Sequence, residues 1–377
     1  MQHPPPLDSI LSGRHLPSLD GLRAVAVGLV IAYHAGYGIP GDLGVTGFFV
    51  LSGFLITWLL LREHDQSGTV SLRGFYLRRT LRIFPAYYAF VVFSLLTDSA
   101  LGHAWTPGQV QSALSYTVNY YNAFNNHEGP IPHTWSLAVE EQFYLCWPFL
   151  FLLLLRRGEG VLRTGLLALT AGVLLWRSFL YVSGTAGSAY VYNALDTRFD
   201  SLSIGCLLAV LLRHPAAHRA GRALAVRPWL PVATAALIAW SRTGGTEAYH
   251  YSLGFTVDSL LIAVLIVQLL QLHPSALWRW LDHRFTRYLG ALSYPLYLWH
   301  LVGLAIGGKL AFLPEAGQDV AGAAVAVALA AGSYHLLEQP VLKLKPRLQA
   351  RLFPAPPASS RAGMDPGIMA HPAAPPL

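Results

Sequence analysis

Ten long apolar stretches alternate with shorter polar segments along the chain. The hydrocarbon core of a bilayer is about 30 Å thick, and about 20 apolar helical residues cross it. The clearest stretch, GVTGFFVLSGFLITWLLL at 44–61, has no charged residue, whereas the stretch at 198–212 is short and begins with Arg198. We therefore predict an all-α polytopic membrane bundle of about ten transmembrane helices. The expected spans are 22–39, 43–61, 83–101, 139–155, 164–183, 198–212, 224–241, 251–272, 288–311 and 318–338.

The composition agrees with this pattern and excludes an ordinary soluble domain. Only 12% of the 377 residues are charged and 54% are hydrophobic, whereas soluble domains carry about 25% charged residues. The two cysteines, Cys146 and Cys206, both lie inside apolar stretches. Neither a disulfide framework nor a metal site is therefore expected.

The basic residues indicate which side of the membrane each loop occupies. Lys and Arg concentrate in the cytoplasmic loops of membrane proteins. With a cytoplasmic N-terminus, only four of the 26 Lys and Arg residues fall within spans or outside, and the long outer loop at 98–138 has none. The four exceptions are Arg177, Arg198, Arg242 and Lys309. We predict that both termini are cytoplasmic, and the spread of charge over many loops explains the net charge of +7 without a nucleic-acid partner.

The same pattern divides the chain into three parts. Residues 1–15 are expected to form an N-terminal cytoplasmic segment, and residues 16–345 the transmembrane domain. The Pro- and Ala-rich tail at 346–377 should be disordered, because it lacks the apolar residues that a core requires.

His34 and Arg23 are the first ionisable pair associated with a span. An ionisable group in a span costs about 2.5 to 3.5 kcal/mol on insertion scales, so each one is a functional candidate. The eleven-residue spacing puts both side chains on one helix face with a rise of about 16.5 Å. His34 suits a general base in the outer half of the membrane. The alternative is a buried histidine bonded to a neighbouring carbonyl.

Glu140 and Glu141 begin the fourth predicted span, at its outer end. Adjacent helical residues point about 100° apart, so the two carboxylates cannot share one task. One could face an internal cavity while the other pairs with a cation, for which Arg198 is the best candidate. The alternative is that both simply cap a helix N-terminus, where carboxylates gain about 0.3 to 1 kcal/mol.

Basic residues and a second histidine complete the candidates. Arg79 and Arg82 are three residues apart, next to Arg78, and this cluster at a helix start suits the phosphates of a ligand. Each arginine alone could equally be a positive-inside anchor. His300 lies twelve residues into a span that begins inside, at much the same depth as His34. It is either a second cavity residue or a packed histidine.

Eight segments together resemble the bacterial membrane acyltransferase-3 family, in family order over residues 16–345. They are LPSLDGLRAVAV, YHAG, GVTGFFVLSGFLIT, FYLRRTLRIFPAYY, HTWSLAVEEQFYL, TRFDSLSIGCLLA, LSYPLYLWH and LEQP. Each motif alone is weak, but eight in order with ten spans are specific.

The resemblance implies a multi-pass enzyme of the bacterial cytoplasmic membrane. Such an enzyme moves an acyl group, usually acetyl, from acyl-CoA to a hydroxyl of a carbohydrate, commonly a surface polysaccharide. It also implies that an arginine and a histidine of the first span are required, here Arg23 and His34. The family's arginine pair corresponds to Arg79 and Arg82. Some relatives carry an additional extracytoplasmic hydrolase-like domain; we find no residues for one and expect direct transfer.

The resulting hypothesis gives each candidate a role. The expected catalytic residues are His34, Glu141 and Glu140, with a glutamate orienting the imidazole. The expected donor-binding residues are Arg23, Arg78, Arg79 and Arg82, and the expected substrate-binding residues are Trp135, Ser136, Arg198 and His300. The segment YTVNYYNAFNN at 116–126 suits a sugar, although an interfacial aromatic belt would also explain it.

Three other functions are compatible with a bundle of this kind. The acceptor could be the sugar of a secondary metabolite such as a macrolide. A transporter or flippase of lipid-linked saccharide would also have many spans, but its expected internal symmetry is not found in the sequence. A polysaccharide polymerase is a weaker alternative.

Overall fold

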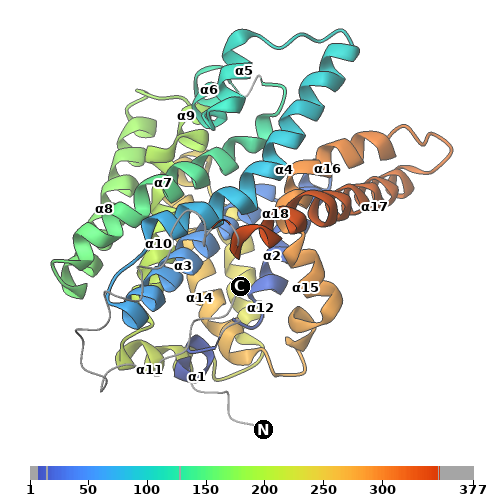
Figure 1. Cartoon of the computed structure of the whole chain (residues 1–377). Helices are drawn as coiled ribbons and strands as arrows, with labels where there is room; N and C mark the ends of the chain where they lie inside the picture. The colour runs from blue at the N-terminus through green and yellow to red at the C-terminus, as the bar shows by residue number, and fades with distance from the viewer. Residues whose placement is uncertain (1–6, 14–15, 127–128, 347, 349–377) are drawn as a thin grey trace.

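The computed structural model describes residues 7–13, 16–126, 129–346 and 348, and its described part contains helices and no strand (Figure 1). The predicted all-α class is therefore confirmed. A short helix α1 (Leu7–Leu11) forms within the predicted N-terminal segment. The predicted disorder of the tail concerns residues that lie almost entirely outside the described ones.

Six segments among the described residues are long and apolar enough to cross a membrane. They are α3 (Gly41–Ser67), α4 (Leu72–Ala100), η1 with α7 (Pro132–Thr134 and Trp135–Leu155), α8 (Glu159–Val182), α13 to α14 (Glu247–Tyr249, His250–Gly254 and Phe255–Leu272) and α17 to α18 (Glu315–Ser333, Tyr334–Glu338 and Gln339–Lys343). Each of them coincides with one predicted span.

A seventh predicted span is a broken helix. α15 (Arg284–Ala291) and α16 (Ser293–Gly307) meet at an angle of 78°. Pro295 lies one turn beyond the break, and because its nitrogen carries no hydrogen it cannot donate to the carbonyl four residues earlier. α16 therefore runs in a different direction from α15.

The remaining three predicted spans coincide with shorter helices. α2 (Leu19–His34), α10 (Leu195–Leu211) and α12 (Leu230–Gly244) have 16, 17 and 15 residues, fewer than the roughly 20 that cross a bilayer perpendicularly. The count of ten spans and the side of each terminus therefore stay predictions.

α3 and α10 form the centre of the bundle because glycines let them approach closely. A Cβ atom on Gly53 would lie 2.0 Å from the carbonyl oxygen of Leu202, and one on Gly205 would lie 2.1 Å from that of Val50. Small residues at such crossings allow two backbones to pack in direct contact, which is how many membrane helices associate. Both glycines are buried.

Short helices gather at one end of the molecule. α5 (Pro107–Leu114), α6 (Val118–Phe124) and α9 (Ser188–Asn193) lie at the top of Figure 1, at the end opposite α1 and α11 (Pro215–Leu224). A 3-10 turn, η3 (Arg279–Asp282), precedes α15. Because the segment containing α5 and α6 joins α4 to α7, it lies on the side predicted to be outside the cell.

Candidate active site

His34 is the last residue of α2 and contacts His300 of α16. Its Nδ1 atom lies 2.9 Å from the carbonyl oxygen of Val30 and 3.1 Å from Nε2 of His300. His300 is fully buried, whereas His34 is exposed. The two rings are in contact, as a shared depth in the membrane would require, although 266 residues separate them in the chain.

The hydrogen bonds determine which nitrogens carry hydrogen. A carbonyl oxygen can only accept, so Nδ1 of His300, which lies 2.7 Å from the oxygen of Tyr297, must donate. Nε2 of His300 then has a lone pair and accepts from Nδ1 of His34, which also faces the Val30 carbonyl. The remaining nitrogen of His34, Nε2, is therefore the one with a free lone pair. The arrangement leaves a proton-accepting nitrogen on an exposed ring.

A buried layer of polar groups supports His300. The ring of His133 lies edge-on to it, with the centroids 5.3 Å apart. The Tyr297 hydroxyl donates to the carbonyl of His133 over 2.7 Å, and the Ser136 hydroxyl donates to Tyr297 over 2.8 Å. Ser136 was predicted to contact the substrate, but it is only 5% exposed and bonds to Tyr297 instead. Its observed contact is with the protein interior.

The glutamates lie inside their helix, not at its end. α7 begins at Trp135, four residues before the predicted start of its span, and has no acidic residue in its first turn. The alternative of helix capping is therefore wrong. Glu140 accepts a hydrogen bond of 2.6 Å from Ser52, which in turn accepts one of 3.0 Å from Tyr144. Neither described hydrogen bond of His34 involves a glutamate, so the predicted orienting contact is replaced by His300.

Arginines from α2 and α4 adjoin these carboxylates. Arg79 lies over the ring of Tyr144, with its guanidinium carbon 4.7 Å from the centroid. Arg23 and Arg79 are both within electrostatic range of Glu140, and Arg79 also of Glu141. The structure therefore brings Arg23 and Arg79 near enough to the glutamates for electrostatic interaction, whereas the sequence analysis assigns the two groups to opposite faces of the membrane.

The other members of the predicted arginine cluster differ in their surroundings. Arg82 interacts electrostatically with Arg23 and with Glu338, a 2% exposed carboxylate at the end of the π-helical segment. Arg78 instead pairs with Glu63 over 3.0 Å, in a bridge whose side chains are partly exposed. Arg78 therefore has a different carboxylate partner from Arg79 and Arg82.

Arg198 has aromatic neighbours and not a glutamate. Its guanidinium carbon lies 3.6 Å from the ring centroid of Phe255 and 5.7 Å from that of Trp135, and it donates to the Thr46 hydroxyl over 3.1 Å. The predicted pairing of Arg198 with a glutamate is not found among the described contacts, in which Glu140 bonds to Ser52 instead. Trp135 packs on Arg198 and Phe49 and is 5% exposed, which leaves no open face for a sugar.

Four neighbours of the site were not assigned from the sequence, although each lies in a quoted motif. They are His133, Tyr144, Tyr297 and Glu338. A polar residue in an apolar span is the signal that could have found them. The sequence could not say which of them lie close together, because their partners come from other helices.

The acyltransferase domain family matches residues 16–335. The chain is 33% identical to YrhL of Bacillus subtilis, over 87% of this chain and 55% of that protein. It is 29% identical to the peptidoglycan O-acetyltransferase OatA of Listeria monocytogenes, over 88% and 56%, and 32% identical to the O-acetyltransferase OatA of Staphylococcus aureus, over 78% and 51%. The chain spans about half the length of these relatives, and no solved structure significantly matches it.

Proposed function

The chain belongs to the acyltransferase domain family, and from this premise we propose that it acetylates a hydroxyl of a cell-wall carbohydrate. Both OatA relatives are named as O-acetyltransferases, and one of them as acting on peptidoglycan. The apolar helices make it a membrane protein, and we assign it to the bacterial cytoplasmic membrane. The observation that carries the proposal is the exposed His34 ring, whose hydrogen bonds leave Nε2 free to accept a proton.

We further propose that acetyl-CoA is the donor. Guanidinium groups bind phosphates through paired, charge-assisted hydrogen bonds. Arg23, Arg79 and Arg82 are all partly exposed and come together from two helices. Arg23 and His34 lie eleven residues apart on α2, a rise of about 16.5 Å. Such a separation suits a donor whose phosphates and thioester are at opposite ends of a long arm.

His34 acts as the general base in this mechanism. Its Nε2 takes the proton of the acceptor hydroxyl as that oxygen attacks the thioester carbonyl. A C–O ester bond forms, the C–S bond breaks, and the proton passes on to the departing coenzyme A thiolate. While the ring is charged, its Nδ1–H donates to His300, which stabilises the imidazolium. A positioned base of this kind typically supplies about 10² to 10⁴-fold in rate.

The glutamates take a different role from the one first expected. Glu140 and Glu141 interact electrostatically with Arg79, so in this proposal they balance the charge of the arginines and do not orient the imidazole. Ser52 and Tyr144 extend this support, because they link Glu140 to the ring under Arg79. These residues position the donor site without contacting the reacting hydroxyl.

The test uses the full chain reconstituted in lipid vesicles with labelled acetyl-CoA and soluble peptidoglycan strands. Mass spectrometry should find acetyl esters on the glycan. Arg82→Gln should raise the KM for acetyl-CoA about tenfold or more, because a lost charge-assisted hydrogen bond costs about 1.5 to 3 kcal/mol. Arg73→Gln, an exposed position on the same helix, should leave that KM unchanged.

The possible failures separate the donor from the activity. Acetylation from another acetyl donor, with none from acetyl-CoA, would overturn the donor assignment alone. Saccharide movement across the vesicle membrane with no ester formed from any donor would overturn the acetyltransferase itself.

A further inference from the structure

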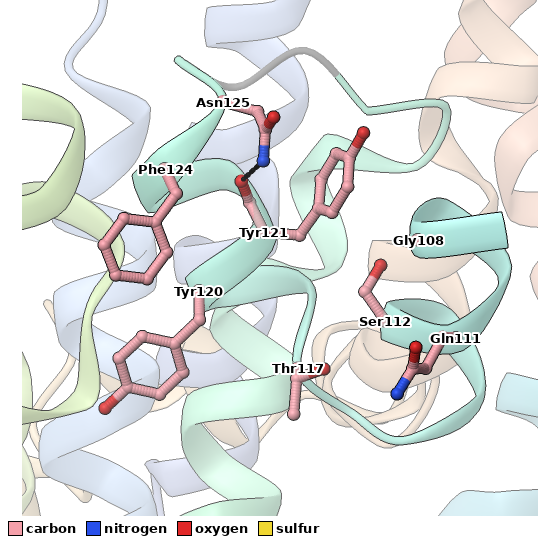
Figure 2. A pocket seen from close by; sticks show the side chains of 8 residues that line it. All are labelled: Gly108, Gln111, Ser112, Thr117, Tyr120, Tyr121, Phe124 and Asn125. Atoms are coloured by element: carbon pink, nitrogen blue, oxygen red, sulfur yellow. Dashed lines mark hydrogen bonds between the residues drawn. The ribbon is translucent and has the colours of Figure 1, made fainter. Parts of the chain in front are cut away.

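An open hollow of about 280 Å³ lies between α5 and α6, apart from the histidines and arginines described above. Figure 2 shows that its side chains come from two helices. Tyr121 of α6 contributes an aromatic ring on the side of α5, and Gln111 of α5 contributes an amide. The rings of Tyr120 and Phe124 lie on the other side of α6, where Phe124 contacts Tyr190 with the ring centroids 5.6 Å apart. Asn125, just after α6, turns its amide nitrogen back to the carbonyl of Tyr121 over 2.8 Å.

The α5 side of this hollow is hydrogen-bonded to α4. The Tyr87 hydroxyl donates to the carbonyl of Ala113 over 2.9 Å, and the Tyr88 hydroxyl donates to that of Leu114 over 3.0 Å. These bonds satisfy carbonyls at the C-terminal end of α5, which have no partner within the helix. α5 is therefore held in a fixed position against a long membrane helix.

The α6 side of the hollow is hydrogen-bonded to α7, the helix that carries the glutamates, and to the turn before it. The Asn122 amide donates to the carbonyl of Pro132 over 2.9 Å, and the Gln142 amide donates to that of Tyr116 over 2.8 Å. Gln142 directly follows Glu141 in α7. The hollow is thus connected rigidly to the candidate active site, although it does not belong to it.

The lining is chemically suited to an uncharged, amphipathic ring. No residue lining the hollow, within the described part of the chain, is charged. Tyr121 is partly exposed and Gln111 is exposed. Aromatic faces pack against C–H surfaces, while free amides and hydroxyls bond to hydroxyl groups. A sugar ring presents both kinds of surface.

A second hollow continues from the first. It is lined by Trp105, Val110 and Leu114 among others, has a volume of about 630 Å³, and shares Gln111 with the first hollow. Its lining is also uncharged. Two adjoining hollows on the side predicted to face outward offer room for more than one ring of a chain.

We propose that these hollows bind sugar residues of the acceptor glycan next to the residue that is acetylated. The inference rests on the proposed function for the identity of the glycan, and it adds a site that holds the strand without taking part in the reaction. Tyr121, Ser112 and Gln111 contact neutral sugar rings in this proposal. The site would therefore matter for a polymer and not for a single sugar.

The test measures binding and turnover separately, with soluble peptidoglycan strands and an N-acetylglucosamine monosaccharide as probes. Tyr121→Ala and Gln111→Ala should each weaken strand binding about tenfold, the factor expected for one lost aromatic or polar contact of about 1.4 kcal/mol. The KM for strands should rise by the same factor, while kcat and the slow reaction with the monosaccharide stay unchanged. Phe312→Ala, at an 81% exposed aromatic outside the hollows, is the matched control.

His34→Ala distinguishes the failure of this inference from the failure of the proposed function. That variant should bind strands as tightly as the unchanged protein, even though it does not acetylate them. Strand binding by the unchanged protein without any acetylation would overturn the proposed function and leave the glycan site intact. Unchanged strand binding in both Tyr121→Ala and Gln111→Ala, or an equal loss in Phe312→Ala, would overturn the glycan site.

Discussion

At the scale of single residues, the chemistry depends on one hydrogen bond between two histidines. His300 is held by the carbonyl of Tyr297, and this fixes the nitrogen that it offers to His34. The residue that orients the base is thus a neutral imidazole, where the sequence had suggested a carboxylate. A neutral partner avoids placing a further buried charge beside His34, which would be costly to desolvate.

His300 should behave as a positioning residue. His300→Leu removes the acceptor for the His34 Nδ1–H, and we expect kcat to fall about 10- to 100-fold, because an unmatched buried hydrogen bond costs about 1 to 3 kcal/mol. His300→Asn keeps an acceptor oxygen and should recover part of the rate. The KM for both substrates should stay unchanged in steady-state assays. Equal losses in the two variants would mean that His300 only fills space.

How much the sequence could reveal at this scale differs between residues. His34 and His300 could be identified as candidates because ionisable groups in spans are costly. Helix geometry predicted that Arg23 and His34 share one helix face. The partners of Arg198 and Glu140 could not be predicted in this way. They depend on how α14 packs against α10 and how α3 packs against α7. Contacts across helices far apart in the chain are not encoded in any local pattern.

At the scale of elements, hydrophobic stretches located the helices but not their ends. The fourth predicted span began at residue 139, whereas α7 begins at Trp135. The polar HTWS segment before the apolar run is helical because its side chains bond to other elements, as Ser136 does to Tyr297. This shift of one turn moves the glutamates from a helix end to its interior.

The crossing of α3 and α10 should be sensitive to a single methyl group. Gly205→Ala would put its Cβ 2.1 Å from the Val50 carbonyl oxygen, so the backbones must separate. We expect destabilisation by about 1 to 3 kcal/mol, as for other overpacked cores. Gly172→Ala in α8 meets nothing within 4 Å and should be neutral or stabilising. Thermal unfolding in detergent measures the stability of both variants. Equal unfolding midpoints for Gly205→Ala and Gly172→Ala would contradict the close packing of α3 and α10.

At the scale of the whole molecule, the hollows lie on α5 and α6, at the end of the bundle opposite α1 and α11 (Figure 1). Charge distribution in the sequence predicts that this end faces out of the cell. It could not give the number of complete crossings, because α2, α10 and α12 are shorter than a bilayer is thick.

Cysteine labelling should establish the sidedness. In a background with Cys146 and Cys206 replaced by Ser, Phe124→Cys and Phe312→Cys should react with a membrane-impermeant maleimide on intact cells. Arg157→Cys, in a loop predicted to be cytoplasmic, should react only after permeabilisation. Labelling of Arg157→Cys on intact cells would contradict the ten-span topology.

The central claim is that Nε2 of His34 accepts the proton of the acceptor hydroxyl. The most direct measurement is single-turnover transfer of label from acetyl-CoA to soluble glycan strands by His34→Ala in vesicles, with insertion verified by protease protection. The rate should fall by about 10² to 10⁴-fold, the usual contribution of a general base, while strand binding is retained. A correctly inserted His34→Ala protein that transfers acetyl groups at a near-normal rate would contradict the account.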